Sequence, residues 1–222
     1  MSDPAPRKHR PSREDSRERL LDAAEQLFAD RGFDGVPVRD ITEQAGTRLA
    51  EINDQFGGKQ ELFEAVVRRR AAVLNRQRVA RLHALPRKGS SAARVAALVD
   101  AFALPLLERS REGDGWRAYL RLVALLHASR SPVLLLIADE FLPVVQACSA
   151  ELRDIFPGMN DRTVLNAYGF MVAAVMAVFS ENLRLDFYSG GQLRSGDFDD
   201  NYQDMCTFVE AGLQAMGLAG QT

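Results

Sequence analysis

Apolar residues recur along this chain with the period of an α-helix. The first repeat follows the i, i+3, i+4, i+7, i+8 rule through Leu20, Ala23, Ala24, Leu27 and Phe28. Gly32 stands where this helix is expected to end. No stretch alternates apolar and polar residues with the β-branched content of a strand. The pattern therefore predicts an all-α fold.

Three more repeats follow closely and predict two short helices and a long one. The short helices are expected over 38–45 and 49–56, with Gly46 between them, because glycine adopts the positive φ of a sharp turn. Their inward-facing residues are expected to be Ile41, Ala45, Leu49, Ile52 and Phe56. Two glycines separate the second short helix from a long one over 59–85. Two short helices around a tight turn are typical of the helix-turn-helix that reads DNA.

The rest of the chain shows five further helical patterns and one clear linker. The helices are expected over 91–110, 116–129, 133–156, 161–187 and 200–216. Pro86 and Gly89 mark the linker before the first of them. Pro105 and Pro143 lie inside apolar patterns and should kink two of the helices, because proline has no backbone donor.

Composition and charge indicate a globular protein without a general attraction for nucleic acid. The 222 residues are 46% hydrophobic and the net charge is -2, so DNA binding must come from a local basic patch. Cys148 and Cys206 have no metal-ligand spacing and are expected to be buried free thiols in a reducing compartment. The polar start of the chain shows no signal peptide, and the longest apolar run, 167–179, is expected to be too short for a bilayer. We expect a cytoplasmic protein that contacts no membrane.

Three segments of the N-terminal part resemble the TetR family of bacterial transcriptional regulators. They are LLDAAEQLFADRGF, VRDITEQAG and FGGKQELF, in that order. The resemblance implies a homodimer whose helix over 49–56 enters the major groove of double-stranded operator DNA. It also implies a divergent C-terminal domain that binds a small effector and dimerises through its last two long helices. The expected parts are a basic arm (1–13), a DNA-binding domain (14–60), an effector and dimerisation domain (61–216) and a tail (217–222).

The resemblance further implies which residues contact DNA. Arg39 and Thr42 would meet backbone phosphates, as would Lys59 with the N-terminus of its helix. The residues that would face base edges are Arg48, Glu51, Asn53 and Gln55.

Two acids on the reading helix, Glu51 and Asp54, are unexpected on a surface that meets a polyanion. An acid can specify a base by accepting from cytosine N4, but it cannot add affinity. The attraction is then expected from nearby cations, including three residues of the arm that would enter a minor groove, Arg7, Lys8 and Arg10. Such a run is also typical of a solvated tail, and Asp54 could pair with Arg48 or Lys59. A chain that has lost DNA binding and acts as a dimeric sensor or adaptor is the alternative function.

The C-terminal helices offer candidates for a dimer interface and an effector pocket. Two apolar stripes predict the interface at Tyr168, Val172, Val175, Phe179, Met205, Val209 and Leu213. The pocket is expected among Phe102, Trp116, Arg121, Leu122, His127, Phe141 and Met171. Both stripes could instead pack within one subunit, and the pocket residues could be plain core. The layout of 141–159 and 183–193 is similar to that of the TetR branch that senses long-chain fatty acids or their thioesters.

No catalytic pattern accompanies these features. The chain has three histidines, His9, His83 and His127, and no grouping with a nucleophile, phosphate loop or metal signature. We therefore expect no enzyme, no metal and no cofactor. The predicted function is that of a repressor that leaves its operator when a small hydrophobic or amphipathic effector binds.

Overall fold

The structure is a computed structural model that describes residues 12–130 and 132–219, except for the side chain of Leu134. Within these residues ten α-helices and one 3-10 helix form and no strand does, which confirms the predicted all-α fold. The elements are α1 (Arg13–Arg31), α2 (Val38–Ala45), α3 (Leu49–Phe56), α4 (Lys59–His83), α5 (Ser91–Ser110), α6 (Asp114–Ala128), η1 (Pro132–Leu136), α7 (Ala138–Ile155), α8 (Asp161–Phe179), α9 (Arg184–Tyr188) and α10 (Phe198–Ala219).

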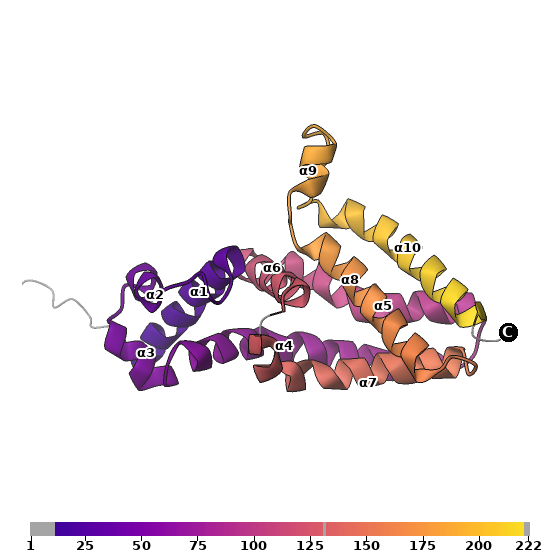
Figure 1. Cartoon of the computed structure of the whole chain (residues 1–222), viewed down its shortest axis with the longest axis horizontal. Helices are drawn as coiled ribbons and strands as arrows, with labels where there is room; N and C mark the ends of the chain where they lie inside the picture. Colours follow the sequence, from indigo (N-terminus) through magenta and orange to yellow (C-terminus); the bar gives the residue numbers. More distant parts are fainter. Residues whose placement is uncertain (1–11, 131, 220–222) are drawn as a thin grey trace, which may run out of the picture.

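The helices form an elongated molecule with α1, α2 and α3 at one end (Figure 1). From that end α4 runs along the length of the body, with α7 beside it, while α1 packs against α6. Toward the other end α10 packs on α5 and α8, while α9 projects from near the middle of the body. The boundary predicted between residues 60 and 61 falls inside α4, so one continuous helix joins the two ends.

Glycines end the N-terminal helices where the sequence predicts it. Gly32 follows α1 with φ 71°, and Gly46 follows α2 in the left-handed region with φ 61° and ψ 41°. The linker around Gly89 precedes α5, whose bounds coincide with the predicted 91–110. Pro105 and Pro143 lie inside α5 and α7, as expected.

Two predicted helices are interrupted. The segment 133–156 is divided into η1 and α7, with a break at Ile137. The segment 161–187 leaves the helical path after Phe179, because Glu181 and Leu183 adopt positive φ values of 46° and 61°. The polar run 180–182 follows there, and the Ser180 hydroxyl donates to the Ala177 carbonyl at 2.9 Å, a local bond that competes with helix continuation.

A buried carboxylate fastens α1 to α4 and α6. Glu25 is 1% exposed and accepts from Arg70 Nε at 2.7 Å and from Arg69 Nη2 at 3.2 Å. The Arg70 guanidinium also lies 4.8 Å above the ring of Trp116 in α6. Loss of one partner from a buried ion pair costs about 3–5 kcal/mol, so Glu25 holds α1 firmly on α4, whose Arg70 also contacts α6.

One helix in the described residues, α8, is long and apolar enough to cross a membrane by length and composition alone, although the apolar run 167–179 is only part of it. Its 19 residues include a window of mean hydropathy 1.5, of which 33% is buried. The helix nevertheless packs against α6, α7 and α10. It is a core helix of this fold with one side left to solvent.

Candidate functional site

The turn between α2 and α3 directs one face of α3 to solvent. The Gly46 N–H donates to the Glu43 carbonyl at 3.2 Å, and the Thr47 N–H donates to the Thr42 carbonyl at 2.9 Å. Ile52, which is 1% exposed, anchors the helix from its inner side. The residues that reach solvent are Arg48, Leu49, Ala50, Asn53 and Asp54.

Two residues expected in the core lie at the ends of α3. Leu49 begins the helix and is 58% exposed. Phe56 ends it and is half-buried, with Arg17 4.3 Å above its ring. In a helix of eight residues only the central Ile52 is fully covered, so the inward stripe predicted from spacing is shorter than expected.

Glu51 faces α1 rather than solvent, which corrects the prediction that it projects outward. Its carboxylate accepts a hydrogen bond from the Ser16 hydroxyl of α1 and one from the Arg48 N–H at 3.4 Å. The hydrogen bond from the Ser16 hydroxyl is the largest of the effects that lower the pKa of Glu51, and the bonds from Arg48 add to it. Burial raises the pKa, but by less, so the pKa lies below its usual range. Because Glu51 is the third residue of α3, it caps the helix N-terminus and ties it to α1.

Gln55 is also turned inward, so the prediction that it projects outward is wrong. Its Nε2 donates to Ser16 Oγ at 3.3 Å. Two arginines of α1 bind carbonyls at the C-terminal end of α3, since Arg17 Nη1 donates to the Gln55 carbonyl at 3.1 Å and Arg13 Nη2 to the Asp54 carbonyl at 3.2 Å. Cations there complement the negative end of the helix dipole. The inner side of α3 therefore packs on α1 and is hydrogen-bonded to it.

Of the three residues predicted to contact phosphates, one is exposed and two face other parts of the chain. Arg39 is exposed. Thr42 is only 6% exposed, and its hydroxyl donates to the Arg39 carbonyl at 2.9 Å, which corrects the expectation of a free phosphate donor. Lys59 lies with Nζ 4.4 Å above the Phe33 ring, and desolvation by burial lowers its pKa.

The outward surface of the reading unit therefore consists of fewer residues than predicted. Arg39, Arg48 and Asn53 are solvent-exposed as expected. Asp54 is exposed as well, and within the described residues it forms an ion pair with neither Arg48 nor Lys59. Three predicted arm residues, Arg7, Lys8 and Arg10, lie outside the described residues.

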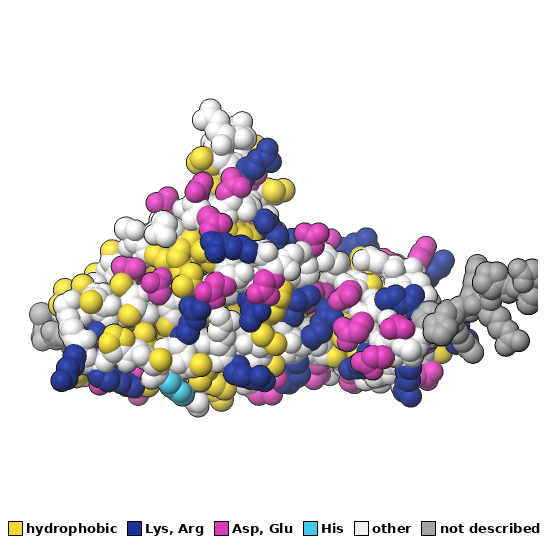
Figure 2. Space-filling view, turned by 180° about the vertical axis from the view of Figure 1, so that it is seen from behind, with side chains coloured by type: hydrophobic (Ala, Val, Ile, Leu, Met, Phe, Trp, Pro, Cys, Tyr) yellow, Lys and Arg dark blue, Asp and Glu magenta, His cyan; other side chains and the backbone are white. Residues whose placement is uncertain are grey.

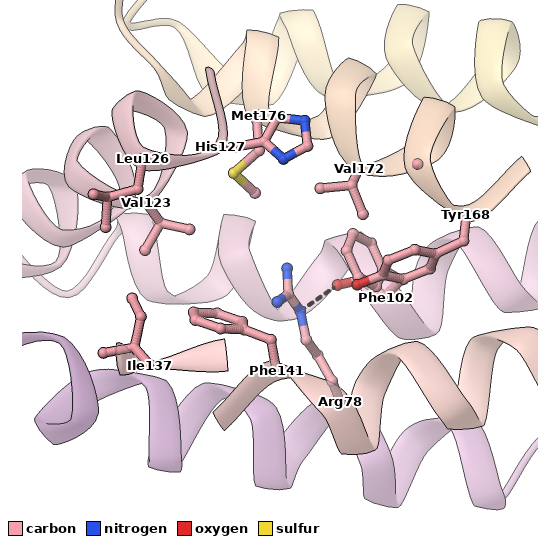
Figure 3. Close-up of a pocket in the computed structure, with 11 residues that line it drawn as sticks. Arg78, Phe102, Val123, Leu126, His127, Ile137, Phe141, Tyr168, Val172 and Met176 are labelled. Atoms are coloured by element: carbon pink, nitrogen blue, oxygen red, sulfur yellow. Dashed lines mark hydrogen bonds between the residues drawn. The ribbon is translucent and has the colours of Figure 1, made fainter. Parts of the chain in front are cut away.

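A cavity of about 190 Å³ that is partly open to solvent lies among α4, α5, α6, α7 and α8 (Figure 3). Its walls are mostly apolar. The lining residues are Arg78, Phe102, Val123, Leu126, His127, Ile137, Phe141, Tyr168, Gly169, Val172 and Met176. Such a cavity, with few polar groups in an apolar wall, is typical of a small-molecule site.

Three of the predicted pocket residues, Phe102, His127 and Phe141, line this cavity. His127 is solvent-exposed, so it is not the core histidine considered as an alternative. The other four predicted residues do not line this cavity.

Each of those four has other neighbours. Leu122 and Met171 are 0% and 1% exposed in the core. Trp116 packs between the guanidinium groups of Arg70 and Arg109. Arg121 pairs with Glu181 Oε2 at 2.7 Å.

The polar residue that the sequence pattern did not reveal is Arg78. It is 4% exposed, and its Nε donates to the Phe102 carbonyl at 2.9 Å. Tyr168 meets the Phe102 ring edge to face at 6.0 Å, and burial raises its pKa to about 12. A sequence signal for Arg78 exists, because it follows the buried Leu74 by four residues and precedes the buried Leu82 by four.

The predicted dimer stripe is mostly the core of a single subunit. Tyr168 and Val172 line the cavity. The other members are buried within their own chain: Val175, Phe179, Met205, Val209 and Leu213. The alternative that the stripes pack within one subunit holds for these residues, because α8 and α10 pack against each other and against α5 and α6.

The opposite faces of α8 and α10 remain uncovered. Phe170 and Leu165 of α8 are 63% and 53% exposed, while Phe208 and Leu218 of α10 are 74% and 56% exposed. Small exposed residues lie between them, namely Ala173, Ala177, Ala211 and Ala215. We call these eight residues the outer α8/α10 face.

The projection that contains α9 also carries exposed aromatic residues. Phe187 and Tyr188 are 82% and 77% exposed. Figure 2 shows hydrophobic side chains beside acidic and basic ones on this projection, and acidic and basic side chains are intermixed along the body as well. Large apolar side chains left in solvent typically mark an interaction surface.

The two cysteines are free and buried, as predicted. Burial raises the pKa of the Cys148 thiol to about 12, so this thiol stays protonated and unreactive at neutral pH. Among the residues that the structure describes, no group of three or more His, Cys, Asp and Glu could hold a metal ion.

Comparisons with known proteins agree with this architecture. The profile of the family described as "Bacterial regulatory proteins, tetR family" matches residues 20–66. The profile described as "Tetracyclin repressor-like, C-terminal domain" matches residues 100–212. Over 57 residues the chain is 39% identical to the HTH-type transcriptional repressor AcnR of Corynebacterium efficiens. That match covers 26% of this chain and only 30% of AcnR.

Solved structures resemble the chain over most of its length. A candidate regulator of fatty acid metabolism from Clostridium perfringens matches with a TM-score of 0.62 at 12% identity, over 87% of this chain and 97% of that one. A candidate transcriptional regulator from Saccharomonospora viridis, solved in complex with choline, matches with a TM-score of 0.55 at 20% identity, over 89% and 96%. At these identities the likeness concerns the fold alone.

Proposed function

The chain belongs to the TetR family of bacterial transcriptional regulators, and from that premise we propose that it is a dimeric repressor that a small effector releases from operator DNA. One observation carries the proposal. A single helix, α4, starts beside the reading helix α3 and also provides Arg78 to the cavity. Occupation of the cavity can thus act on the orientation of α3 through one rigid element. We place the protein in the cytoplasm, where its DNA is.

DNA is read by the exposed side of α3. Arg48 and Asn53 carry the donors and acceptors that distinguish bases in the major groove. Leu49 and Ala50 beside them can contact thymine methyl groups, and Arg39 on α2 can meet a phosphate. Glu51 is absent from this set, because its carboxylate binds Ser16.

The basic arm supplies further affinity. Arg7, Lys8 and Arg10 precede α1 by a few residues and offset the negative charge of Asp54. Removal of one cation that binds a phosphate lowers the log-log dependence of affinity on salt by about one unit. Alanine at all three positions should therefore weaken operator binding and flatten its salt dependence, and an unchanged slope would exclude the arm.

A second copy of the chain covers the outer α8/α10 face. Four large apolar side chains of this face are exposed, and such a patch is unusual on a protein that stays monomeric. In addition, α8 is apolar in composition, yet only 33% of its most apolar window is buried within the chain. Alanine residues between the large side chains allow close approach of two helices. A two-fold axis there makes a four-helix interface. Such a dimer presents both α3 helices to the same side of the DNA. This arrangement is required if the two helices are to read successive major grooves, which lie roughly 34–36 Å apart.

Fluorescence anisotropy tests the proposal directly. Labelled duplexes from the region upstream of the chain's own gene are titrated with the full chain at two salt concentrations. We expect salt-dependent, sequence-selective binding, and replacement of Arg48 and Asn53 by alanine should weaken it at least about tenfold. Lys88→Ala is the matched control, because it removes one exposed cation from the α4–α5 loop, away from α3 (Figure 1).

Two results would contradict the proposal. Equal binding of operator and unrelated duplexes at every salt concentration would favour the dimeric adaptor instead. An equal loss of affinity in Lys88→Ala would show that charge alone, and not the α3 surface, determines binding.

A further inference from the structure

The most unusual group in the cavity is the guanidinium of Arg78. It reaches the cavity from α4, at a position where the helix turns the buried Leu74 and Leu82 inward. In Figure 3 the side chain points into the cavity toward Phe102 and Tyr168. The helical register therefore places a charged group that is 4% exposed inside an apolar wall.

Part of the Arg78 hydrogen bonding has a structural explanation. Its Nε donates to the Phe102 carbonyl at 2.9 Å, and its Nη1 donates to Asn75 Oδ1 at 3.4 Å. The Phe102 carbonyl belongs to α5, so this bond joins α4 to α5. Nη2 is different, because it is buried and has no hydrogen-bond partner within the described residues.

The other partly buried arginines of α4 each have a carboxylate. The pairs are Arg68 with Asp139 and Glu140, Arg69 and Arg70 with Glu25, and Arg81 with Glu108. Arg78 alone among these has only neutral acceptors in the part of the chain that the structure describes. The Arg78 guanidinium also lies 4.2 Å above the Phe102 ring, whose face attracts a cation, but no carboxylate balances its charge among the described residues.

The neighbours that could carry a negative charge are neutral at physiological pH. Tyr168, Tyr119 and Cys148 act on Arg78 electrostatically. Burial raises the pKa of Tyr168 to about 12, that of Cys148 to about 12 and that of Tyr119 further. Burial lowers the pKa of Arg78 itself, yet a guanidinium remains protonated in proteins. A water molecule could satisfy Nη2 but would leave the charge in place.

Size and lining restrict what else can enter. Besides Arg78, the walls include Val123, Leu126, Ile137 and Val172. An engineered apolar cavity of about 150 Å³ accepts benzene, and this cavity is about 190 Å³. It therefore suits one ring or a short alkyl chain together with a small polar group.

We infer that the cavity binds a small organic monocarboxylate, with the carboxylate on Arg78 Nη2 and an aromatic or medium-length alkyl body against the apolar walls. This inference rests on the proposed role of the cavity as the effector site and names the effector's class. An acyl thioester lacks the negative charge next to its acyl chain, so it would leave Arg78 uncompensated. A quaternary ammonium ion would be repelled.

Isothermal titration calorimetry of the full chain without DNA tests the inference separately from repression. The probes are benzoate, octanoate, their primary amides, and choline. At least one carboxylate should bind about 10- to 100-fold more tightly than its amide, since a charge-assisted hydrogen bond is lost in the amide. Choline should not bind. Equal affinity for acid and amide, or no binding of either acid, overturns the inference.

Two variants, each with a control, test whether the ligand lies in the cavity. Arg78→Gln should abolish the preference for acid over amide, whereas Arg121→Gln, which changes an arginine outside the cavity, should retain it. If Arg78→Gln does not fold, Gly169→Leu replaces it. A Cβ on Gly169 meets no atom within 4 Å, so the leucine enters the cavity without a backbone clash, and Gly169→Ala is its small control.

The variant outcomes separate the two proposals. Binding of octanoate or benzoate that survives in Gly169→Leu places the ligand elsewhere and overturns the inference. A carboxylate that binds through Arg78 without changing operator affinity refutes the proposed function and leaves the inference standing. Release of the operator by a neutral or cationic effector supports the proposed function and overturns the inference.

Discussion

The bond between Ser16 and Glu51 decides whether the acid on α3 reads DNA or positions the helix. We predict that Glu51→Gln weakens the packing of α3 on α1. The carboxylate accepts from Ser16 and from the Arg48 N–H, and hydrogen bonds to a charged group contribute about 1.5–3 kcal/mol. Because the side chain is 24% exposed, we expect the lower end, about 1.5 kcal/mol, in the free energy of unfolding.

Urea denaturation of the wild type, Glu51→Gln, Ser16→Ala and the double variant measures this value. A double-mutant cycle should give a coupling energy of about 1 kcal/mol, because the two residues share one bond. Asp54→Asn is the control on the same helix. Its carboxylate is exposed and unpaired in the described structure, so its unfolding free energy should change by less than about 0.5 kcal/mol.

The pH dependence has a definite sign. The Ser16 hydroxyl holds the pKa of Glu51 below its ordinary value of 4.5. The stabilisation is therefore fully present above pH 4.5 and is lost as the pH falls through the lower pKa of the folded protein. The stability difference between the wild type and Glu51→Gln should shrink in that acidic window and stay constant between about pH 6 and 8.

DNA binding separates the two roles of Glu51. A positioning residue predicts that Glu51→Gln lowers affinity equally for all operator variants, whereas a base contact predicts relaxed preference at one base pair, by about 1–3 kcal/mol. Selective relaxation at one base pair, without a loss of stability, would refute the positioning role. Asp54→Asn should bind every duplex more tightly, since it removes a negative charge from the exposed face.

Three further predictions concern packing and chemistry. Phe170→Ser together with Phe208→Ser should shift the chain from dimer to monomer in sedimentation velocity, and a dimer that persists at micromolar concentration would remove the outer α8/α10 face from the interface. Glu25→Gln should cost about 3–5 kcal/mol in urea denaturation because two arginines lose their buried partner, while Asp22→Asn, which removes an exposed partner of Arg69, should cost less than about 1 kcal/mol. Cys148, 0% exposed and with a pKa raised to about 12, should react with a thiol reagent only after urea unfolds the chain; rapid reaction in native buffer would contradict its burial.

Helices with one apolar side and a glycine end were predictable from the sequence. Spacing alone places α5 over its observed range, and Gly32 and Gly46 end α1 and α2 with positive φ. Longer patterns were less reliable, because apolar spacing continues across a break. Leu183 fits the helical period of α8 but has φ 61°, and only the hydrogen bonds of the polar run before it decide where the helix ends.

The candidate site was predictable only in part, because the sequence does not show which way a polar side chain at the edge of a helix face points. Periodicity identifies which side of a helix is apolar, but it does not identify the polar residues at the edge of that side that bind a specific partner such as Ser16. Glu51 and Gln55 were misassigned for this reason, since the partner lies 35 residues away in the case of Glu51.

The predicted dimer stripe coincides with the core of one chain because α8 is apolar on more than one side. The more regular stripe, which includes Val175 and Phe179, is the core, and the less regular one, which includes Phe170, is exposed. A sequence alone does not distinguish which apolar side meets the same chain and which meets a second copy.

The carboxylate ligand proposed for Arg78 would bind a residue of α4 that has no carboxylate partner in the described chain. Between Lys59 and Arg78 there are 19 steps (78 − 59), or about 28 Å at about 1.5 Å per residue. Along the first part of that span, ion pairs fasten Arg68 to α7 and Arg70 to α1, whereas Arg78 has no carboxylate of its own in the described chain. Under the proposed function, a carboxylate bound to Arg78 would act on α4, and the Arg70 pair with Glu25 would carry a shift of α4 to α1, which holds α3 through Ser16. The bonds that join α4, α1 and α3 would then let one small ligand in the cavity alter the distance between the two reading helices of the proposed dimer.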